Sequence, residues 1–576
     1  MANPVGELSA RLSSAIEAAF GPSHAGADPL VRRSAQPQFG DYQANFAMGL
    51  AKSLGQPPRA VAEAVVDRLD VSGLAEPPSI AGPGFVNFRL LPTALSGAVS
   101  ALLDDPRVGV AEAEPAECVA IDYSSPTLAK EMHIGHLRST IIGDALTRTL
   151  SFLGHKVVRQ NHLGDWGTQF GMLIEQLIDV GAHGEVSLAD LNAFYQQANA
   201  RFTSDGSFAE RARARVVKMQ SGDEETLGFW RRFVAESHRH AKEIYDRLGV
   251  LLTDDDIRAE SAYNPMLADV ARDLEDERIA VVDDGALVVF SEKYEAPLLV
   301  RKSDGGYMYG TTDLAAVRYR TQELGATLLV YVVGAPQAQH LEQVFDAARR
   351  MGWLAPPARA VHVVFGSVLG PDRRMYKTRS GENIKLNELL DEAVTRAAAK
   401  VAESSGDALS DAERAVIARA VGIGAVKYAD LANDRVKDYV FDWERMLAFE
   451  GNTGPYLQYA HARIRSIFRR AEVDGASLAA STGTVVVAED AERALVLQLL
   501  GLGEAVAAVA ETLQPHRLCT YLFDLAQAFT AFYESCPVLR APDEETRQSR
   551  LALSEATARA LALGLSLLGI EAPERM

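Results

Sequence analysis

The stretch Ser124-Ser-Pro-Thr-Leu-Ala-Lys-Glu-Met-His-Ile-Gly-His-Leu-Arg-Ser-Thr140 decides the fold class of this sequence. It follows residues 118–121, a short apolar run typical of a buried parallel strand, and it leads into a helical pattern over about 133–153. A second strand is predicted at 156–159. This β-loop-α-β order is typical of a doubly wound nucleotide-binding sheet. Two later apolar runs complete the predicted parallel sheet, at 328–333 and 361–365.

His133 and His136 are the first candidates for catalysis. They stand three residues apart, so a helix that begins here places both on one face, and its N-terminus attracts an anion. Gly135 between them removes a side chain where a flat ring must approach the backbone. Together these features suit ATP, with the imidazoles donating hydrogen bonds to the charge that develops on the α-phosphate. Two ordinary helix residues, or a metal pair without a nearby third ligand, are the alternatives.

Composition narrows the class of protein. With 576 residues, and about 150 residues per domain, the chain suggests about four domains. Its 48% hydrophobic and 23% charged residues exclude a disordered chain. Because the formal charge is −19, binding of any polyanion needs local basic patches. The 3 cysteines are scattered, which argues against a thiolate zinc site and suits a reducing cytoplasm.

No membrane span and no P-loop are expected. The best apolar stretch, 556–570, is short and contains Arg559, so it fits a buried helix better than a transmembrane one. The sequence G-x-x-x-x-G-K-[ST] does not occur, which argues against a P-loop mechanism.

Four regions are predicted along the chain: 1–112, 113–385, 386–450 and 451–576. The first is an α+β domain with helical patterns at 5–20 and 58–70 and a strand at 80–88 that a Gly/Pro turn opens. The second is the sheet domain, with insertions at about 172–240 and 260–306. Strands are expected there at 287–290 and 298–301, followed by a hairpin turn at 304–306. From 386 onward the pattern is helical almost to the end.

Several blocks of sequence resemble one known family. Residues 129–144 (AKEMHIGHLRSTIIGD) resemble the class I aminoacyl-tRNA synthetases, and in detail the arginyl-tRNA synthetase family. Further blocks resemble that family in chain order: 39–42 (FGDY), 162–171 (HLGDWGTQFG), 309–313 (YGTTD), 432–435 (ANDR), 441–443 (FDW), 453–461 (TGPYLQYAH) and 575–576 (RM). The resemblance therefore spans the whole chain.

The resemblance implies both a reaction and a fold. L-arginine and ATP form arginyl-adenylate and pyrophosphate, usually with tRNA bound, and the arginyl group then passes to the 3′ end of tRNA(Arg) for protein synthesis. Magnesium accompanies ATP as part of the substrate, and no tightly bound metal is expected. The implied fold is α/β: a class I Rossmann-like parallel sheet with insertions, an N-terminal α+β domain that binds the tRNA elbow, a helical stem-contact connection at 386–450 and a C-terminal all-α anticodon-binding domain. A cytoplasmic monomer is the default expectation.

The resemblance also implies a second catalytic signature. It falls on residues 375–381, which keep Lys377 and Arg379 but carry Ser380 where class I enzymes usually have a lysine. In the family a lysine just before the H-x-G-H pattern is thought to compensate, and here that residue is Lys130. Catalysis needs a cation on the β- and γ-phosphates, whichever backbone segment supplies it. The implied ATP contacts are Pro126, His133, Gly135, His136 and Lys377.

An arginine pocket follows from chemistry and resemblance together. A guanidinium demands carboxylate or carbonyl acceptors, at least one of them ionised. Asp122 ends the first predicted strand, and Tyr309 and Asp313 share a face if their segment is helical. By resemblance the arginine-binding residues are Asp122, Ser124, Thr127, His136, Tyr309, Asp313 and Gln337; Thr127 stands where the family usually has asparagine.

A basic segment near residue 460 is the candidate tRNA surface. Two tyrosines precede several arginines there, so base stacking and phosphate binding lie close together. The predicted tRNA-binding residues are Tyr456, Tyr459, Arg463, Arg465, Arg469 and Arg470. A solvated helix face is the alternative.

Three other functions compete with this reading. A different class I synthetase, an H-x-G-H nucleotidyltransferase that charges no tRNA, and a catalytically inactive tRNA-binding paralogue share parts of the pattern. The 309–313 block argues against the first, the long helical C-terminal region against the second, and intact His133, Gly135 and His136 against the third.

Overall fold

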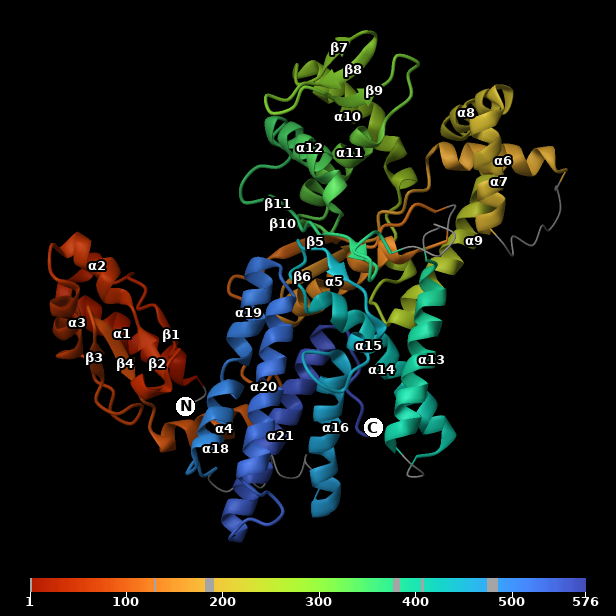
Figure 1. Cartoon of the computed structure of the whole chain (residues 1–576). Coiled ribbons are helices and arrows are strands. Elements are labelled where there is room, and N and C mark those ends of the chain that lie inside the picture. Colours follow the sequence, from red (N-terminus) through yellow and green to blue (C-terminus); the bar gives the residue numbers. More distant parts are fainter. Residues whose placement is uncertain (1–2, 129–130, 182–190, 377–383, 406–408, 474–484) are drawn as a thin grey trace.

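The protein is described by a computed structural model covering residues 3–128, 131–181, 191–376, 384–405, 409–473 and 485–576. An N-terminal lobe lies to one side of the molecule, and the helical C-terminal domain lies between that lobe and the central sheet domain (Figure 1). The lobe contains an antiparallel sheet in the order β1-β2-β4-β3. Its elements are α1 (Pro4–Phe20), β1 (Val31–Arg33), β2 (Tyr42–Ala44), α2 (Phe46–Leu54), α3 (Pro58–Val66), β3 (Ser79–Ala81), β4 (Phe85–Phe88) and α4 (Pro92–Asp104).

The segment 80–88 is a hairpin and not the single strand that the sequence predicted. Gly82 and Gly84 between β3 and β4 have φ angles of 55° and 140°, a backbone conformation that favours glycine. A Cβ on Gly84 would lie 2.8 Å from the carbonyl oxygen of Pro58, so the turn packs directly against α3. The Gly/Pro turn thus reverses the chain instead of opening a strand.

The central sheet is parallel, in the order β11-β10-β5-β6. Its strands are β5 (Cys118–Asp122), β6 (Lys156–Gln160), β10 (Leu328–Tyr331) and β11 (Arg359–His362), which confirms the predicted strands, with the last shifted toward the N-terminus. Residues of β5 alternate between two cores: Val119 and Ile121 pack with α5 (Ile134–Phe152), and Ala120 packs on the opposite face. The opposite face carries α10 (Asn264–Asp276), α11 (Tyr309–Gln322) and α12 (Ala338–Arg350).

Two insertions project from the sheet domain (Figure 1). The first is helical and has its own apolar core around Phe170, Phe208 and Phe233. The second adds an antiparallel sheet in the order β7-β8-β9, which includes both strands that the sequence predicted. The elements are α6 (Thr168–Asp179), α7 (Leu191–Ser204), α8 (Gly206–Gln220), α9 (Glu224–Leu248), β7 (Val281–Asp283), β8 (Ala286–Val289) and β9 (Leu298–Arg301).

In the described residues after β11, the regular elements are helices apart from the parallel pair β12 (Val368–Leu369) and β13 (Tyr439–Val440). These helices are α13 (Leu386–Ser405), α14 (Asp411–Leu431), α15 (Trp443–Met446), α16 (Gly454–Ala471), α18 (Asp490–Leu499), α19 (Leu502–Thr512), α20 (His516–Ser535) and α21 (Glu544–Leu567). Asp430 of α14 pairs with Arg138 of α5 at 3.0 Å, and both side chains are almost completely buried. This buried ion pair joins the helical region to the central sheet domain.

One stretch in the described ranges, Asp490–Thr512, is long and apolar enough to cross a membrane by length and composition alone. This stretch is not the 556–570 segment considered from the sequence, and it forms two separate helices, α18 and α19. Glu492 within it is buried and pairs with Arg550 at 2.8 Å. Packing of this kind is typical of the core helices of a helical domain.

Candidate active site

The two histidines meet at the N-terminus of α5, as predicted. His133 is the N-cap residue, and the centres of the two imidazole rings are 4.2 Å apart. The backbone N–H of His133 donates to Nδ1 of His136 at 3.1 Å, and the N–H of Gly135 donates to Nδ1 of His133 at 3.1 Å. Because Nδ1 of each ring accepts, the proton of each neutral ring sits on Nε2. Each imidazole can therefore donate from Nε2.

Gly135 is required for a reason that differs from the sequence interpretation. A Cβ at this position would lie 2.8 Å from Cε1 and 2.9 Å from Nδ1 of His133. The flat ring that Gly135 accommodates is therefore the imidazole of His133, folded back over the first turn of the helix. Substitution of this glycine would displace a candidate catalytic group.

The loop after β5 has strained backbone. Ser124 and Ser125 have φ angles of 65° and 43°, which are uncommon outside glycine. The hydroxyl of Ser124 is buried and lies 2.8 Å from the Tyr245 hydroxyl, while its N–H donates to Ser139 Oγ at 3.0 Å. The hydroxyl of Ser124 is thus bound inside the protein, and the assignment of Ser124 to the arginine site stays a prediction.

The same loop pairs with the segment that follows β6. The carbonyl oxygen of Pro126 accepts from the N–H of Gly164 at 3.2 Å, and Thr127 forms an isolated parallel bridge with Gly164. Pro126 is buried and Thr127 is exposed. Thr127 thus lies on the open side of a loop at the carboxyl ends of the sheet strands, where ligands of α/β folds bind.

Asp122 binds a guanidinium, but it is one from the protein itself. Its Oδ2 lies 2.7 Å from Nη2 of Arg320 on α11, and its Oδ1 accepts from Ser125 Oγ at 2.7 Å. The guanidinium of Arg320 also lies over the ring of Tyr331, 4.8 Å from its centre. Each carboxylate oxygen of Asp122 thus holds one protein donor, and the contact of Asp122 with substrate arginine stays a prediction.

Tyr309 and Asp313 lie in the first turns of α11, on a helix as expected. Oδ2 of Asp313 lies 2.5 Å from Nε2 of His340, and Oδ1 lies 3.9 Å from Nε2 of His162. The ring of Tyr309 is 57% exposed and packs against His340 with ring centres 4.7 Å apart. Gln337 ends a short 3₁₀ turn (Ala335–Gln337) directly before α12. The structure thus brings α11, the start of α12 and the 162–171 block together.

Glu260 is a further acidic residue here that the sequence reasoning missed. Burial, and then the nearby carboxylates Asp313 and Asp165, raise its pKa from 4.5 to about 7. Asp165 is itself buried and accepts from the N–H and hydroxyl of Ser261 at 2.9 and 2.6 Å. No sequence motif includes Glu260. His162 lies in the 162–171 block that resembles the family, but the resemblance implied no role for it. A group of carboxylates in partly buried surroundings suits a cationic ligand.

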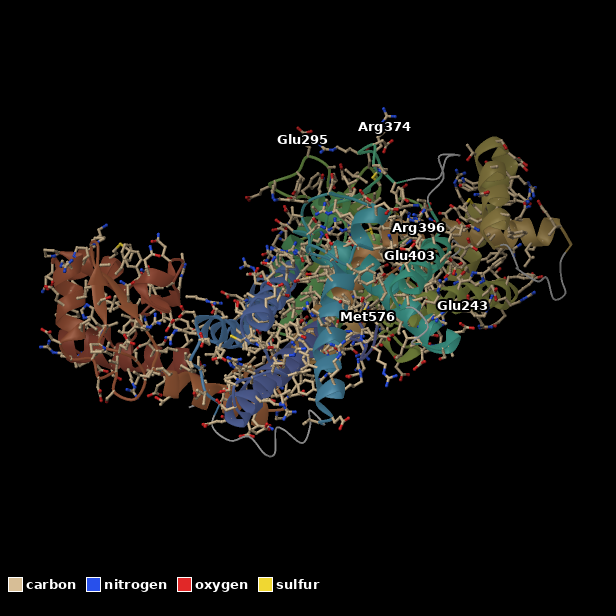
Figure 2. All side chains as sticks on the ribbon, turned by 60° about the horizontal axis from the view of Figure 1, so that its bottom comes forward. Glu243, Glu295, Arg374, Arg396, Glu403 and Met576 are labelled. Atoms are coloured by element: carbon tan, nitrogen blue, oxygen red, sulfur yellow. The ribbon has the colours of Figure 1, made fainter. Side chains whose placement is uncertain are left out.

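Lys130, Lys377 and Arg379 lie outside the described residues. The chain that leads into the second signature forms a tight turn, in which Leu369 is the bridge partner of Met375, the first residue of the signature. Arg374 in this turn projects outward from the molecule (Figure 2). Among the residues that the structure describes, no three His, Cys, Asp or Glu side chains gather as a metal site requires. The absence of a tightly bound metal stays a prediction.

The predicted basic face on α16 is mostly occupied by the protein itself. Arg465 pairs with Glu555 at 2.7 Å and with Glu574 at 3.5 Å. Arg469 donates to the carbonyl oxygen of Glu574 at 2.9 Å, and Arg463 lies over the ring of Tyr533 at 4.6 Å. The C-terminal segment of the chain thus covers one side of this face, and the tRNA contacts of these residues stay a prediction.

The remaining residues of that surface differ in exposure. Tyr456 packs against Phe523 with ring centres 5.7 Å apart, whereas Tyr459 is 44% exposed and Arg470 is exposed. Two cavities of about 410 and 450 Å³ lie beside the same C-terminal segment, and both are lined by Glu571 and Ala572. Neither cavity lies at the N-terminus of α5, because none of the candidate active-site residues lines them.

A parallel sheet with an H-x-G-H pair at a helix N-terminus is typical of the class I aminoacyl-tRNA synthetases, and comparison with known proteins places the chain in this class. The family model described as tRNA synthetases class I (R), catalytic domain, matches residues 98–443. The DALR anticodon binding domain matches 457–576, and the arginyl tRNA synthetase N terminal domain matches 6–90. The chain belongs to the arginyl-tRNA synthetase family.

Individual relatives match over essentially the whole chain. The arginine–tRNA ligase of Thermobifida fusca is 53% identical over 585 residues and covers 100% of both chains, and that of an Enterobacter species is 49% identical over 99% of both. The arginyl-tRNA synthetase of Plasmodium falciparum superposes with a TM-score of 0.86 at 28% identity over 99% of both chains. That of Thermus thermophilus has a TM-score of 0.83 at 27% identity, covering 99% of this chain and 100% of its own.

Proposed function

We propose that this aminoacyl-tRNA ligase activates L-arginine with ATP at the N-terminus of α5 and then transfers the arginyl group to the 3′ end of tRNA(Arg). The observation that carries the proposal is the pair of imidazoles, 4.2 Å apart at a helix N-terminus and each accepting a backbone N–H at Nδ1, within a domain that also holds a group of carboxylates around Asp313. The first chemistry suits phosphate and the second suits a guanidinium.

In the first step the carboxylate of arginine attacks the α-phosphate of ATP, and pyrophosphate leaves with its electron pair on the bridging oxygen. Negative charge on the phosphate oxygens shifts during this displacement. His133 and His136 stabilise it by donating from Nε2, and the positive end of the α5 dipole adds to the same effect. Mg²⁺ arrives with ATP as part of the substrate. The 3′-terminal ribose hydroxyl of tRNA then attacks the arginyl carbonyl, and AMP leaves.

Recognition of the arginine side chain is assigned to α11 and its neighbours. Asp313 supplies the ionised acceptor, and the exposed ring of Tyr309 offers a flat face for the planar guanidinium. Glu260 supplies a second carboxylate, and its proton leaves when the cation binds. Gln337 and Thr127 are assigned to the amino-acid backbone, because both lie at carboxyl ends of the sheet.

The proposed partners follow the four regions. Residues 1–112 bind the tRNA elbow, 386–450 contact the acceptor stem, and 451–576 bind the anticodon region. On α16 the exposed Tyr459 and Arg470 are the candidates for tRNA contact, with Tyr456 and Arg463 supporting them through aromatic packing. The proposed state is a cytoplasmic monomer.

Arginine-dependent exchange between pyrophosphate and ATP, with and without tRNA(Arg), tests the function. We expect exchange with arginine alone among the amino acids, and dependence on tRNA. Alanine at His133 or His136 should lower kcat by about 10²-fold, the scale of one lost transition-state donor, whereas His24→Ala on the N-terminal lobe should not. Exchange driven by another amino acid, or normal kinetics in the double histidine variant, would refute the proposal.

Lys130 is proposed to supply the cation that Ser380 lacks. Lys130→Ala should raise the barrier of the activation step by about 2–4 kcal/mol, and the effect should appear in kcat more than in KM. Ser380→Lys should then recover part of the loss. Strict additivity of the two substitutions, without rescue, would show that Lys130 does not supply the missing cation.

A further inference from the structure

Two short segments pair just before the histidine helix. The N–H of Ile134 donates to the carbonyl oxygen of Ile384 at 3.0 Å, and the N–H of Leu386 donates to the carbonyl oxygen of Met132 at 3.0 Å. His133 and Lys385 are opposite each other as an antiparallel bridge. The backbone of His133 is thus held by the segment that begins α13, more than 250 residues further along the chain.

An ion pair reinforces this ladder at one end. Nζ of Lys385 lies 2.8 Å from Oε2 of Glu131, and the two side chains are 39% and 23% exposed. The start of α13 is also held from another direction, because Arg247 of α9 donates to the side-chain oxygen of Asn387 at 2.9 Å and pairs with Asp391 at 2.6 Å. The segment opposite His133 is therefore anchored on two sides.

The register of this ladder determines where the imidazole of His133 points. A slip of one residue in a pair of extended segments turns each side chain to the other face, and a misplacement of a catalytic group by about 1 Å costs about 10²-fold in rate. An ion pair with this exposure adds little to global stability. Its loss should therefore appear in the chemistry and not in the folding of the protein.

We propose that Glu131 and Lys385 are positioning residues for adenylate formation. Their ion pair sets the register between 132–134 and 384–386 and thereby aims His133 at the phosphate. In sequence the pair joins the residues just before the first signature to those just after the second. The inference rests on the proposed function, because it assumes that His133 acts on the α-phosphate.

The test uses the full-length protein in the exchange assay with tRNA present. Absence of exchange by the wild type would contradict the proposed function, and the variants are compared only once that exchange is established. Lys385→Met and Glu131→Gln should each lower kcat about tenfold or more and change KM for ATP and arginine less than about threefold. Lys385→Arg should stay within about threefold of wild type, and the double variant should be no slower than the slower single variant.

Lys400→Met is the matched control. Lys400 lies on the same helix, is 45% exposed and has its Nζ 4.0 Å from Glu403, which Figure 2 labels on α13 beside Arg396. This variant should leave kcat unchanged. Thermal unfolding of every variant is measured in parallel, and if Lys385→Met does not fold, the isosteric Glu131→Gln carries the test.

Three results would overturn the inference. A kcat for Lys385→Met equal to that of the control would show that Lys385 does not position His133. Additive losses in the double variant would show that Glu131 and Lys385 act separately. A raised KM for ATP with kcat unchanged would show that Lys385 binds phosphate directly instead of positioning His133.

Discussion

The charge of Glu260 in the candidate site depends strongly on its surroundings. Burial and the carboxylates of Asp313 and Asp165 raise its pKa to about 7. The folded protein therefore holds an extra proton between pH 4.5 and about 7, and this group makes stability fall as pH rises through that window. A bound guanidinium favours the ionised form, so arginine binding should release a proton near neutral pH.

Arginine affinity should therefore increase as pH rises from about 6 to 8, by up to about tenfold per pH unit below the pKa of Glu260. Glu260→Gln should remove this dependence, weaken binding at pH 8 and raise the unfolding temperature there, because no buried charge forms. Calorimetric titration with arginine in two buffers of different ionisation enthalpy measures both the affinity and the released proton.

Glu275→Gln provides the comparison. Glu275 lies on α10, is 46% exposed and pairs loosely with Arg301 at 3.7 Å. It should leave the pH dependence as in the wild type. A Glu260→Gln protein that keeps the wild-type pH profile would show that another group takes up the proton.

At the scale of elements, α16 shows how a basic helix can serve the fold. Its arginines hold the C-terminal segment: Arg465 binds Glu555 and Glu574, and Arg469 binds the carbonyl oxygen of Glu574. His461 is also buried, with Nδ1 3.0 Å from the carbonyl oxygen of Pro573. The contacts of this helix thus anchor the end of the chain.

Arg465→Gln should destabilise the helical C-terminal domain by about 2–4 kcal/mol, because it leaves Glu555, a side chain only 6% exposed, without its cation. Arg470→Gln on the exposed side of α16 should change stability by less than about 0.5 kcal/mol and weaken tRNA binding, lowering the salt slope by about one if it contacts a phosphate. Urea unfolding of both variants, and tRNA binding at several salt concentrations, measure the two effects. Equal stability of the two variants would contradict this assignment.

At the scale of the whole molecule, one buried ion pair joins the N-terminal lobe to the C-terminal domain. Nε of Arg493 on α18 donates to Oδ1 of Asp41 at 3.0 Å, and its Nη2 donates to the other carboxylate oxygen and to the carbonyl oxygen of Leu90. The two side chains are 12% and 5% exposed. Asp41 also accepts from the N–H of Leu90 at 2.7 Å, so the contact reaches into the lobe's own fold.

Arg493→Ala should loosen the N-terminal lobe without affecting the arginine site. The expected result is faster hydrogen exchange at residues 41–44 and 85–90 and faster proteolysis between 105 and 117, because Asp41 is left buried without its cation. Arginine binding should not change. Arg59→Ala, which breaks an exposed pair with Glu63 inside α3, is the control, and equal exchange in the two variants would show that the lobe is held by other contacts.

The sequence determined the parts of this protein that depend on local pattern. Apolar runs predicted β5, β6 and β10, and the spacing of His133 and His136 predicted a shared helix face, which their ring contact confirms. Tyr309 and Asp313 were expected on one helix, and both lie at the start of α11. These features need only neighbours within a few residues, and periodicity records such neighbours directly.

Tertiary structure alone decided which charges remain open to a ligand. Asp122 is bound by Arg320, 198 residues away, and Arg465 by Glu555, 90 residues away. Glu260 lies close to Asp313 although the two belong to different segments of the chain. Lys385 likewise pairs with Glu131, which lies far earlier in the sequence. The side-chain chemistry of an arginine or a carboxylate is the same whether its partner is the protein or a substrate. Only the folded arrangement of distant segments determines which of the two it binds.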